Sequence, residues 1–297
     1  MIINYVGVVG LGAMGKALSD SLIAADHAVA VWDRHTDRVA TTAMIGASPS
    51  VSPRQLASQS EVIFLALPHA AAVREVLYGE PDGLLAGVKD DSVIIDMTTA
   101  NPALATEIAA HVASLGRNVR YVDAPVSGKA PNLTVMVGGS AGVLGPAESV
   151  VQDIAQHIIY AGGLGAGFAT KLIHQHVKYA THLAVSEALL LATKLGLDIP
   201  TVITALRQST GVEGGQQGAF EFFESNTRAI AKRAPSTTIR KDLDMALALA
   251  DEVKMSSKTL SAAAAFFTAA ASGEYGSRPY PEATALLNEF AVKAEDR

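Results

Sequence analysis

Three glycines near the N-terminus have the spacing of a phosphate-binding turn. Gly10, Gly12 and Gly15 lie in VGVVGLGAMGKAL, between a β-rich run and a run with helical character. The first glycine of such a turn permits the tight bend, the second lets the backbone approach a pyrophosphate, and the third lets helix and strand pack closely. We therefore expect a dinucleotide here, with Ala13 and Met14 beside it. A glycine turn used only for packing is the alternative.

An acidic residue ends the next β-rich run. Asp33 closes HAVAVWD, about 20 residues beyond the glycines, where a carboxylate accepts hydrogen bonds from a ribose and repels a 2′-phosphate. Arg34, His35 and Arg38 follow, and guanidinium groups at this place suit a 2′-phosphate. A solvated helix start explains the two arginines equally well. The sequence thus predicts that Asp33 and Arg34 bind NAD or NADP, with a slight preference for NAD.

A second group of polar residues lies in GAGFATKLIHQHVKY, a predicted helix in apolar surroundings. Lys171, His174, Gln175 and Lys178 have helical spacing and share one face, whereas His176 points away. A lysine can act as a general acid or base if burial lowers its pKa, although a lone lysine on an apolar helix more often reaches out to solvent. Because no carboxylate or cysteine completes a ligand set nearby, we expect no metal and interpret His176 as a packing residue.

The hydrophobic pattern indicates which elements position these residues. Short β-rich runs alternate with Ala-rich helical stretches, which predicts parallel βαβ units; the runs are residues 5–10, 27–32, 61–68, 91–97 and 118–125,. From about residue 168 the pattern is helical, beginning with a stretch long enough to join two domains. We predict an α/β Rossmann domain at 1–164 and an all-α substrate and oligomerisation domain at 165–297, joined by a long interdomain helix.

Composition excludes several classes of function. The 297 residues carry a net charge of −6 with scattered basic residues, so neither nucleic acid nor a membrane surface is an expected partner,. The N-terminus lacks the basic region of a secretory signal, and the chain has no cysteine, which favours a cytoplasmic protein,. Alanine-rich helical segments offer flat apolar faces, which predict a homodimer or homotetramer.

Four further motifs carry a resemblance that covers nearly the whole chain. They are IIDMTTANP at 94–102, DAPVSG at 123–128, GLGAGFATKLIHQ at 163–175 and RKDLDMALALA at 240–250. With the glycine turn, they resemble the β-hydroxyacid dehydrogenase family, which includes 3-hydroxyisobutyrate and tartronate semialdehyde enzymes and has a 6-phosphogluconate dehydrogenase-like architecture. The resemblance implies hydride transfer between NAD(P) and a small 3-hydroxy acid or its oxo form, with one side chain handling the proton.

The resemblance also implies roles for individual residues. Lys171 matches the catalytic lysine, and the segment that holds the substrate carboxylate is matched by Ser127 and Gly128. The remaining matches are cofactor contacts, namely Leu67, Pro68, Thr99 and Lys241.

Two departures from the usual family pattern concern the expected substrate site. His174 and Gln175 stand where many members have two asparagines, and this form resembles an L-threonate dehydrogenase branch. We expect Gln175 to bind substrate and His174 to position it and relay the Lys171 proton, with a packing histidine as the rival interpretation. Lys129 replaces a glycine ahead of a shortened loop, either as a cation for an acidic substrate or as a surface residue.

Two other functions are compatible with this pattern. One is an imine reductase-like enzyme that uses NADPH, which generally carries another residue at the position of Lys171. The other is a cofactor-binding protein without catalysis, against which the retained Lys171, Ser127, Thr99 and Lys241 argue.

Overall fold

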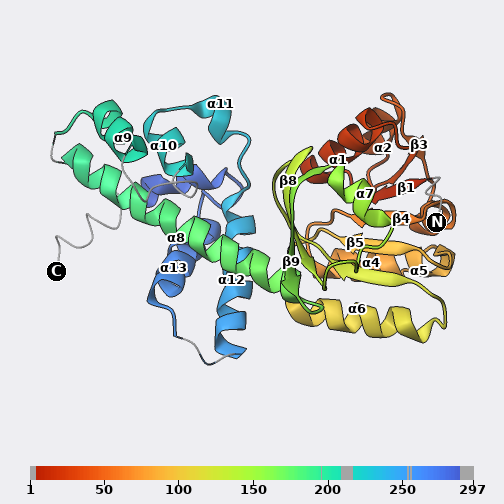
Figure 1. Cartoon of the computed structure of the whole chain (residues 1–297). Helices are drawn as coiled ribbons and strands as arrows, with labels where there is room; N and C mark the ends of the chain where they lie inside the picture. Colours follow the sequence, from red (N-terminus) through yellow and green to blue (C-terminus); the bar gives the residue numbers. More distant parts are fainter. Residues whose placement is uncertain (1–4, 195, 209–216, 253, 255, 288–297) are drawn as a thin grey trace. The chain divides into compact units, whose positions relative to one another are not determined.

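The structure is a computed structural model that describes residues 5–194, 196–208, 217–252, 254 and 256–287 (Figure 1). The chain divides into two compact units, Met1–Lys171 and Leu172–Arg297. We call them the N-terminal unit and the helical unit. Within the described residues, no helix is both long and apolar enough to span a membrane.

A six-stranded parallel sheet forms the centre of the N-terminal unit. Its strands follow the order β3-β2-β1-β4-β5-β6, which is the doubly wound Rossmann order,. The strands are β1 (Val6–Val9), β2 (Val29–Trp32), β3 (Ser48–Pro49), β4 (Val62–Leu65), β5 (Val93–Asp96) and β6 (Arg120–Asp123). Most are short runs of buried β-branched residues, as expected for strands covered on both faces,.

Helices connect these strands and cover the sheet. They are α1 (Ala13–Ala24), α2 (Thr36–Ala43), α3 (Pro53–Gln59), α4 (Ala70–Tyr78), α5 (Leu84–Gly87) and α6 (Pro102–Ser114). Alternate strand residues enter two separate apolar cores: Val8 and Phe64 belong to one, and Val9 and Leu65 belong to the other. This alternation follows from the period of two in a strand. The parallel direction of the strands places the loops that follow them at one edge of the sheet.

A smaller sheet completes the N-terminal unit. It contains β7 (Val126–Lys129), β8 (Asn132–Gly138) and β9 (Ala155–Gly162), with α7 (Ala147–Gln152) before β9. Strands β7 and β8 form an antiparallel hairpin closed by Ala130 and Pro131. Ser127 and Gly128 are part of strand β7, because they pair with Thr134 and Leu133 of β8. The pairing comes from a following strand and has no local sequence signal in PVSG.

The described part of the helical unit has no strand, only one isolated bridge between Pro235 and Pro279. Its elements are the later turns of α8 (Ala166–Lys194), then α9 (Ile199–Gln208), α10 (Gln217–Phe223), α11 (Thr227–Ile230), α12 (Ser236–Glu252), α13 (Lys258–Ser272) and the 3₁₀ helix η1 (Tyr280–Ala285). Past the end of α8, Gly196 adopts a φ of 71° and its N–H bonds to the Thr193 carbonyl at 3.0 Å,. The predicted fold class, a Rossmann domain followed by helices, is confirmed.

Candidate active site

The glycine turn lies at the carboxyl end of β1, where the sheet order reverses between β1 and its neighbours β2 and β4. Gly10 has a φ of +88°, and a Cβ there would lie 2.5 Å from the Ala66 carbonyl oxygen. A Cβ on Gly15 would lie 1.7 Å from the Gly10 carbonyl oxygen. These two glycines are therefore required by backbone conformation and by the close approach of α1 to the sheet.

Gly12 differs from the other two because an added Cβ would meet no atom within 4 Å. The chain itself gives no packing reason for a glycine here. Gly12 precedes α1 and has no side chain to cap it, so the first-turn N–H groups and the positive end of the helix dipole are left for an anionic ligand,. The turn thus fits the pyrophosphate of a dinucleotide. Ala13, which is exposed, and Met14, which is half-buried, begin the same helix.

Asp33 follows β2 and is brought against the glycine turn. One carboxylate oxygen accepts the Leu11 N–H at 2.7 Å, and the other accepts the His35 N–H at 2.8 Å. Arg38 lies 3.6 Å from the same carboxylate. Burial favours a higher pKa for Asp33, but the two backbone donors, His35 and Arg38 outweigh it and lower the pKa. Asp33 is therefore a fixed anion at the turn, whereas Arg34 is exposed.

The loops after β4 and β5 lie at this same edge of the sheet, since both strands are parallel to β1. Leu67 is near the turn, because its side chain would be 3.0 Å from a Cβ on Gly10. Pro68 is exposed and Thr99 is half-buried. Just before Thr99, the buried Asp96 accepts hydrogen bonds from the Thr98 N–H at 2.9 Å and the Tyr121 hydroxyl at 2.7 Å, which hold this loop in place.

The predicted carboxylate-binding segment lies on strand β7 in the smaller sheet. Ser127 is half-buried, and Gly128 is exposed with a φ of +95°, a conformation that favours glycine,. Lys129 is exposed and pairs with Asn132 next to the two-residue hairpin turn. The shortened loop that we inferred after Lys129 is therefore a tight hairpin, and it places the Lys129 side chain at the surface.

Asp123 fixes the start of α8 in the N-terminal unit, a role that our sequence analysis did not assign to it. Its two carboxylate oxygens accept the N–H groups of Gly165 and Phe168 at 2.8 and 2.9 Å. The residue is completely buried, and burial raises the pKa of its carboxyl although the backbone donors oppose that rise. A Cβ on Gly167 would lie 2.3 Å from the Met136 carbonyl oxygen, so α8 approaches the sheets closely. This anchor is one turn before Lys171.

Lys171 itself is only 8% exposed. Along α8, His174 follows at i+3 and is half-buried, and Gln175 follows at i+4 and is 5% exposed. These spacings put the three side chains on one helix face. His176 departs from that face, as predicted, and its Nε2 lies 3.1 Å from the Thr259 hydroxyl of α13.

In the helical unit, Gln175 is joined to α12. Its Nε2 donates a 2.6 Å hydrogen bond to the carboxylate of Asp242, which is 2% exposed. The predicted cofactor residue Lys241 is next to Asp242 in the chain, and its Nζ lies 3.2 Å from the other carboxylate oxygen. Two predicted site residues, Gln175 and Lys241, are thus linked through a carboxylate that our sequence analysis did not single out.

Other polar groups are buried in the same unit. His182 is completely buried, and neither ring nitrogen has a hydrogen-bond partner within the described part of the chain. Burial, helped by the charges of Lys178 and Arg233, lowers the pKa of His182 to about 3. Burial also lowers the pKa of Lys178, with Arg233 adding to the effect and Asp242 opposing it. His182 is therefore neutral at physiological pH.

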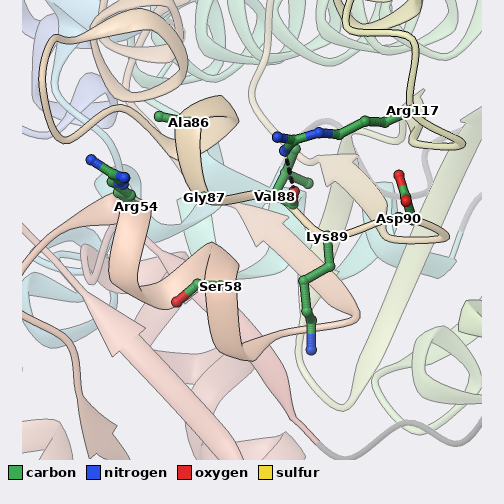
Figure 2. A pocket seen from close by; sticks show the side chains of 8 residues that line it. All are labelled: Arg54, Ser58, Ala86, Gly87, Val88, Lys89, Asp90 and Arg117. Atoms are coloured by element: carbon green, nitrogen blue, oxygen red, sulfur yellow. Dashed lines mark hydrogen bonds between the residues drawn. The ribbon is translucent and has the colours of Figure 1, made fainter.

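A surface depression of about 510 Å³ lies elsewhere in the N-terminal unit, against α3, α5 and the loops before β5 and β6 (Figure 2). It is at the amino ends of the strands, opposite the glycine turn. Two of its basic residues are engaged internally: Arg117 donates to the Val88 carbonyl at 2.7 Å, and Lys89 pairs with Glu61 at 2.5 Å. It includes none of the predicted site residues. Among the described residues, no three His, Asp or Glu side chains gather as metal ligands.

Comparisons with known proteins agree with this arrangement. A family model described as the NAD binding domain of 6-phosphogluconate dehydrogenase matches residues 5–162. A second, described as the NAD-binding domain of NADP-dependent 3-hydroxyisobutyrate dehydrogenase, matches residues 165–286. The 2-(hydroxymethyl)glutarate dehydrogenase of Eubacterium barkeri is 33% identical over 223 residues, which cover 73% of each chain.

Solved structures share the fold over the full length. The 3-hydroxyisobutyrate dehydrogenase of Mycobacterium tuberculosis with L-serine has a TM-score of 0.84 and 25% identity, covering 96% of this chain and 99% of that one. An imine reductase from Pseudomonas sp. has a TM-score of 0.61 and 18% identity over 96% of this chain and 99% of that one, which is a likeness of fold alone. The chain belongs to the β-hydroxyacid dehydrogenase family and is an oxidoreductase that uses NAD or NADP.

Proposed function

We propose that this chain interconverts a small 3-hydroxy acid and its oxo form, with Lys171 as the general acid and base. The observation that carries the proposal is the placement of Lys171. It is 8% exposed on a helix whose first turn is fixed by Asp123 to the unit that holds the glycine turn. A catalytic proton carrier needs a fixed position and little competing water, and this placement supplies both.

The bound dinucleotide would accept or supply the hydride, and the residues of this chain would do the rest. In our proposal the Lys171 amine takes the proton of the substrate hydroxyl during oxidation and returns it to the carbonyl oxygen during reduction. Ser127 and the N–H of Gly128 hold the carboxylate, since a hydroxyl and a backbone N–H suit an anion. His174, on the same helix face, positions the substrate and relays the Lys171 proton.

The cofactor residues of the proposal are those at the carboxyl edge of the parallel sheet together with one lysine of the helical unit. They are Gly10, Gly12, Ala13, Met14, Gly15, Asp33, Arg34, Leu67, Pro68, Thr99 and Lys241. NAD is slightly favoured over NADP because the fixed Asp33 carboxylate opposes a 2′-phosphate. The open space at Gly12 supports the pyrophosphate position.

The substrate class is supported by relatives and by the site. The related proteins act, by their names, on 2-(hydroxymethyl)glutarate and 3-hydroxyisobutyrate. Lys129 is at the surface of the hairpin next to Ser127 and Gly128, where it would attract anionic substrates without closing the pocket,. We propose a hydroxy acid that carries further polar groups, which form hydrogen bonds with His174 and Gln175.

We further propose that residues 1–164 bind the cofactor and residues 165–297 serve substrate binding and assembly into a homodimer or homotetramer. The assembly is supported by the exposed Ile173 and Val177, each 60% exposed on α8, and by exposed alanines on α13,. A cytoplasmic location is supported by the absence of cysteine from the sequence,. Gel filtration with light scattering tests the assembly, and a monomer would contradict it.

The test of the function is a two-step assay. The purified protein is titrated with NADH and NADPH by nicotinamide fluorescence, and the preferred cofactor is then assayed in oxidised form against 3-hydroxyisobutyrate, D-glycerate, L-serine, L-threonate and phenylserine. Turnover of one acid that follows a pH profile and disappears in Lys171→Ala supports the proposal. Tight cofactor binding without turnover of any acid, but with reduction of a cyclic imine, would instead assign the chain to imine reduction.

A further inference from the structure

The buried carboxylate of Asp242 joins two helices of the helical unit. It accepts the Gln175 amide at 2.6 Å from α8 and lies 3.2 Å from the Lys241 ammonium on its own helix α12. At 2% exposure it has almost no access to water. Burial of an acidic group is costly unless charged or hydrogen-bonding partners compensate it, and Gln175 and Lys241 are its partners here.

The contact with Lys241 is unusual for a helix. Consecutive residues on a helix diverge and do not normally face each other. The flexible Lys241 side chain must therefore bend back to bring its Nζ within 3.2 Å of Asp242. The side chain of Lys241 keeps 33% exposure, while its ammonium is paired with the buried carboxylate of Asp242,.

The contact with Gln175 fixes an amide orientation. Helices α8 and α12 pack through one apolar core that contains Leu172 and Tyr179 from α8 and Leu243 from α12. That packing sets the spacing of the two helices, and the Asp242 bond then decides which edge of the Gln175 amide faces α12. Since an amide carries a donor on one edge and an acceptor on the other, its remaining hydrogen-bonding edge is determined as well.

We propose that Asp242 is a positioning residue that orients Lys241 toward the dinucleotide and Gln175 toward the substrate. The inference rests on the proposed function, which gives Lys241 and Gln175 those two roles. Asp242 acts through both side chains, and one buried carboxylate thereby couples the cofactor contact of α12 to the substrate contact of α8.

The test uses Asp242→Asn, which keeps the shape of the side chain and removes its charge. Dinucleotide Kd is measured by fluorescence without substrate. We expect it to rise on the order of tenfold, because Lys241 loses the ion pair that orients its ammonium,. Asp244→Asn is the matched control, because Asp244 lies on the same helix but is exposed and pairs with the exposed Arg240 at 3.3 Å. The dinucleotide Kd of this variant should stay within about twofold of the wild-type value.

A double-mutant cycle separates positioning from a general structural effect. Once Lys241→Ala has removed the ammonium, adding Asp242→Asn should change the dinucleotide Kd by less than about twofold. Effects that simply add, or a Kd for Asp242→Asn equal to that of the wild type, would overturn the proposal. If Asp242→Asn does not fold, Asp242→Glu replaces it; the charge is kept but displaced, and an unchanged Kd in that variant would also refute positioning.

The part of the proposal that concerns Gln175 and the substrate is tested by steady-state kinetics of the same variants. Because Lys171 is untouched, Asp242→Asn should raise the KM for the acid more than it lowers kcat, and Gln175→Ala should reproduce the KM effect. A kcat loss with unchanged KM would contradict this part of the proposal. Absence of turnover in the wild type would refute the proposed function, whereas the dinucleotide measurements would still decide whether Asp242 positions Lys241.

Discussion

The two units of this chain build their site residues in different ways. In the N-terminal unit, the turn depends on backbone: Gly10 and Gly15 allow close approach, and Gly12 leaves open space. In the helical unit, buried side chains from distant segments pair with each other, as Gln175 does with Asp242 across 67 residues. A site that depends on backbone conformation can therefore be recognised from a short sequence motif. A site that depends on pairs of distant side chains cannot.

The hydrophobic cores of the two units also differ in the residues that build them. The cores of the N-terminal unit alternate along each strand and consist mainly of Val, Ile and Leu. The core of the helical unit combines small alanines with Phe and Tyr rings, and it surrounds fully buried polar residues such as His182. Small residues let helices approach closely, and polar residues then meet across the contact.

The largest expected effect concerns Lys171, on the helix that begins in one unit and continues in the other. Lys171→Ala should lower kcat by about 10²–10⁴-fold, the usual contribution of a general acid or base, without changing dinucleotide Kd. Steady-state kinetics and fluorescence titration measure both. Lys258→Ala, at an exposed lysine at the start of α13, is the control. Near-normal kcat in Lys171→Ala would show that the proton is handled elsewhere.

The backbone-built turn can be broken in two distinct ways. Gly15→Ala should destabilise the fold by on the order of 3 kcal/mol, because its Cβ would lie 1.7 Å from the Gly10 carbonyl oxygen,. Gly12→Ala should leave stability almost unchanged, since nothing lies within 4 Å, yet weaken dinucleotide binding by more than about tenfold,. Thermal unfolding and cofactor titration compare the pair. Equal binding by Gly12→Ala and the wild type would exclude the pyrophosphate from this turn.

Buried His182 in the helical unit should make the free energy of unfolding depend on pH. Its folded pKa is about 3, against 6.5 for the free side chain, so the unfolded chain binds a proton below pH 6.5 that the folded chain excludes. Stability from this group is complete above pH 6.5 and falls as the pH drops toward 3, by roughly 3 kcal/mol at pH 4. His182→Leu should flatten the pH dependence of the free energy of unfolding. His157→Gln, at an exposed histidine, should not.

The smallest expected effect concerns Arg38, near the glycine turn, and the preference for NADH or NADPH. Arg38 lies 3.6 Å from Asp33, so Arg38→Ala leaves the carboxylate charge less compensated. NADPH binding should weaken by about fivefold, and NADH binding should change by less than about twofold, since surface charge pairs contribute little. Paired titrations with the two cofactors measure the ratio. A larger loss for NADH than for NADPH would contradict the role given to Asp33.

Much of the N-terminal unit was predictable because its signals are local. The five longer strands of the parallel sheet, the glycine turn and Asp33 follow from short runs and fixed spacings. Strand β7 was missed, because Ser127 and Gly128 become a strand only by pairing with β8. The hairpin after Lys129 likewise depends on that pairing.

The sequence by itself determined the alternation of five strands with helices in the parallel sheet, the fold class, the family, and the positions of Lys171 and the glycine turn, because these depend on periodicity and on residues near one another in the chain. Only the tertiary structure decided that Asp123 caps α8, that Asp242 joins Gln175 to Lys241, and that His182 is buried without a partner. The contacts of Asp123 with α8 and of Asp242 with Gln175 connect residues 42 to 67 positions apart. Their existence depends on how helices and sheets pack, which no local spacing encodes.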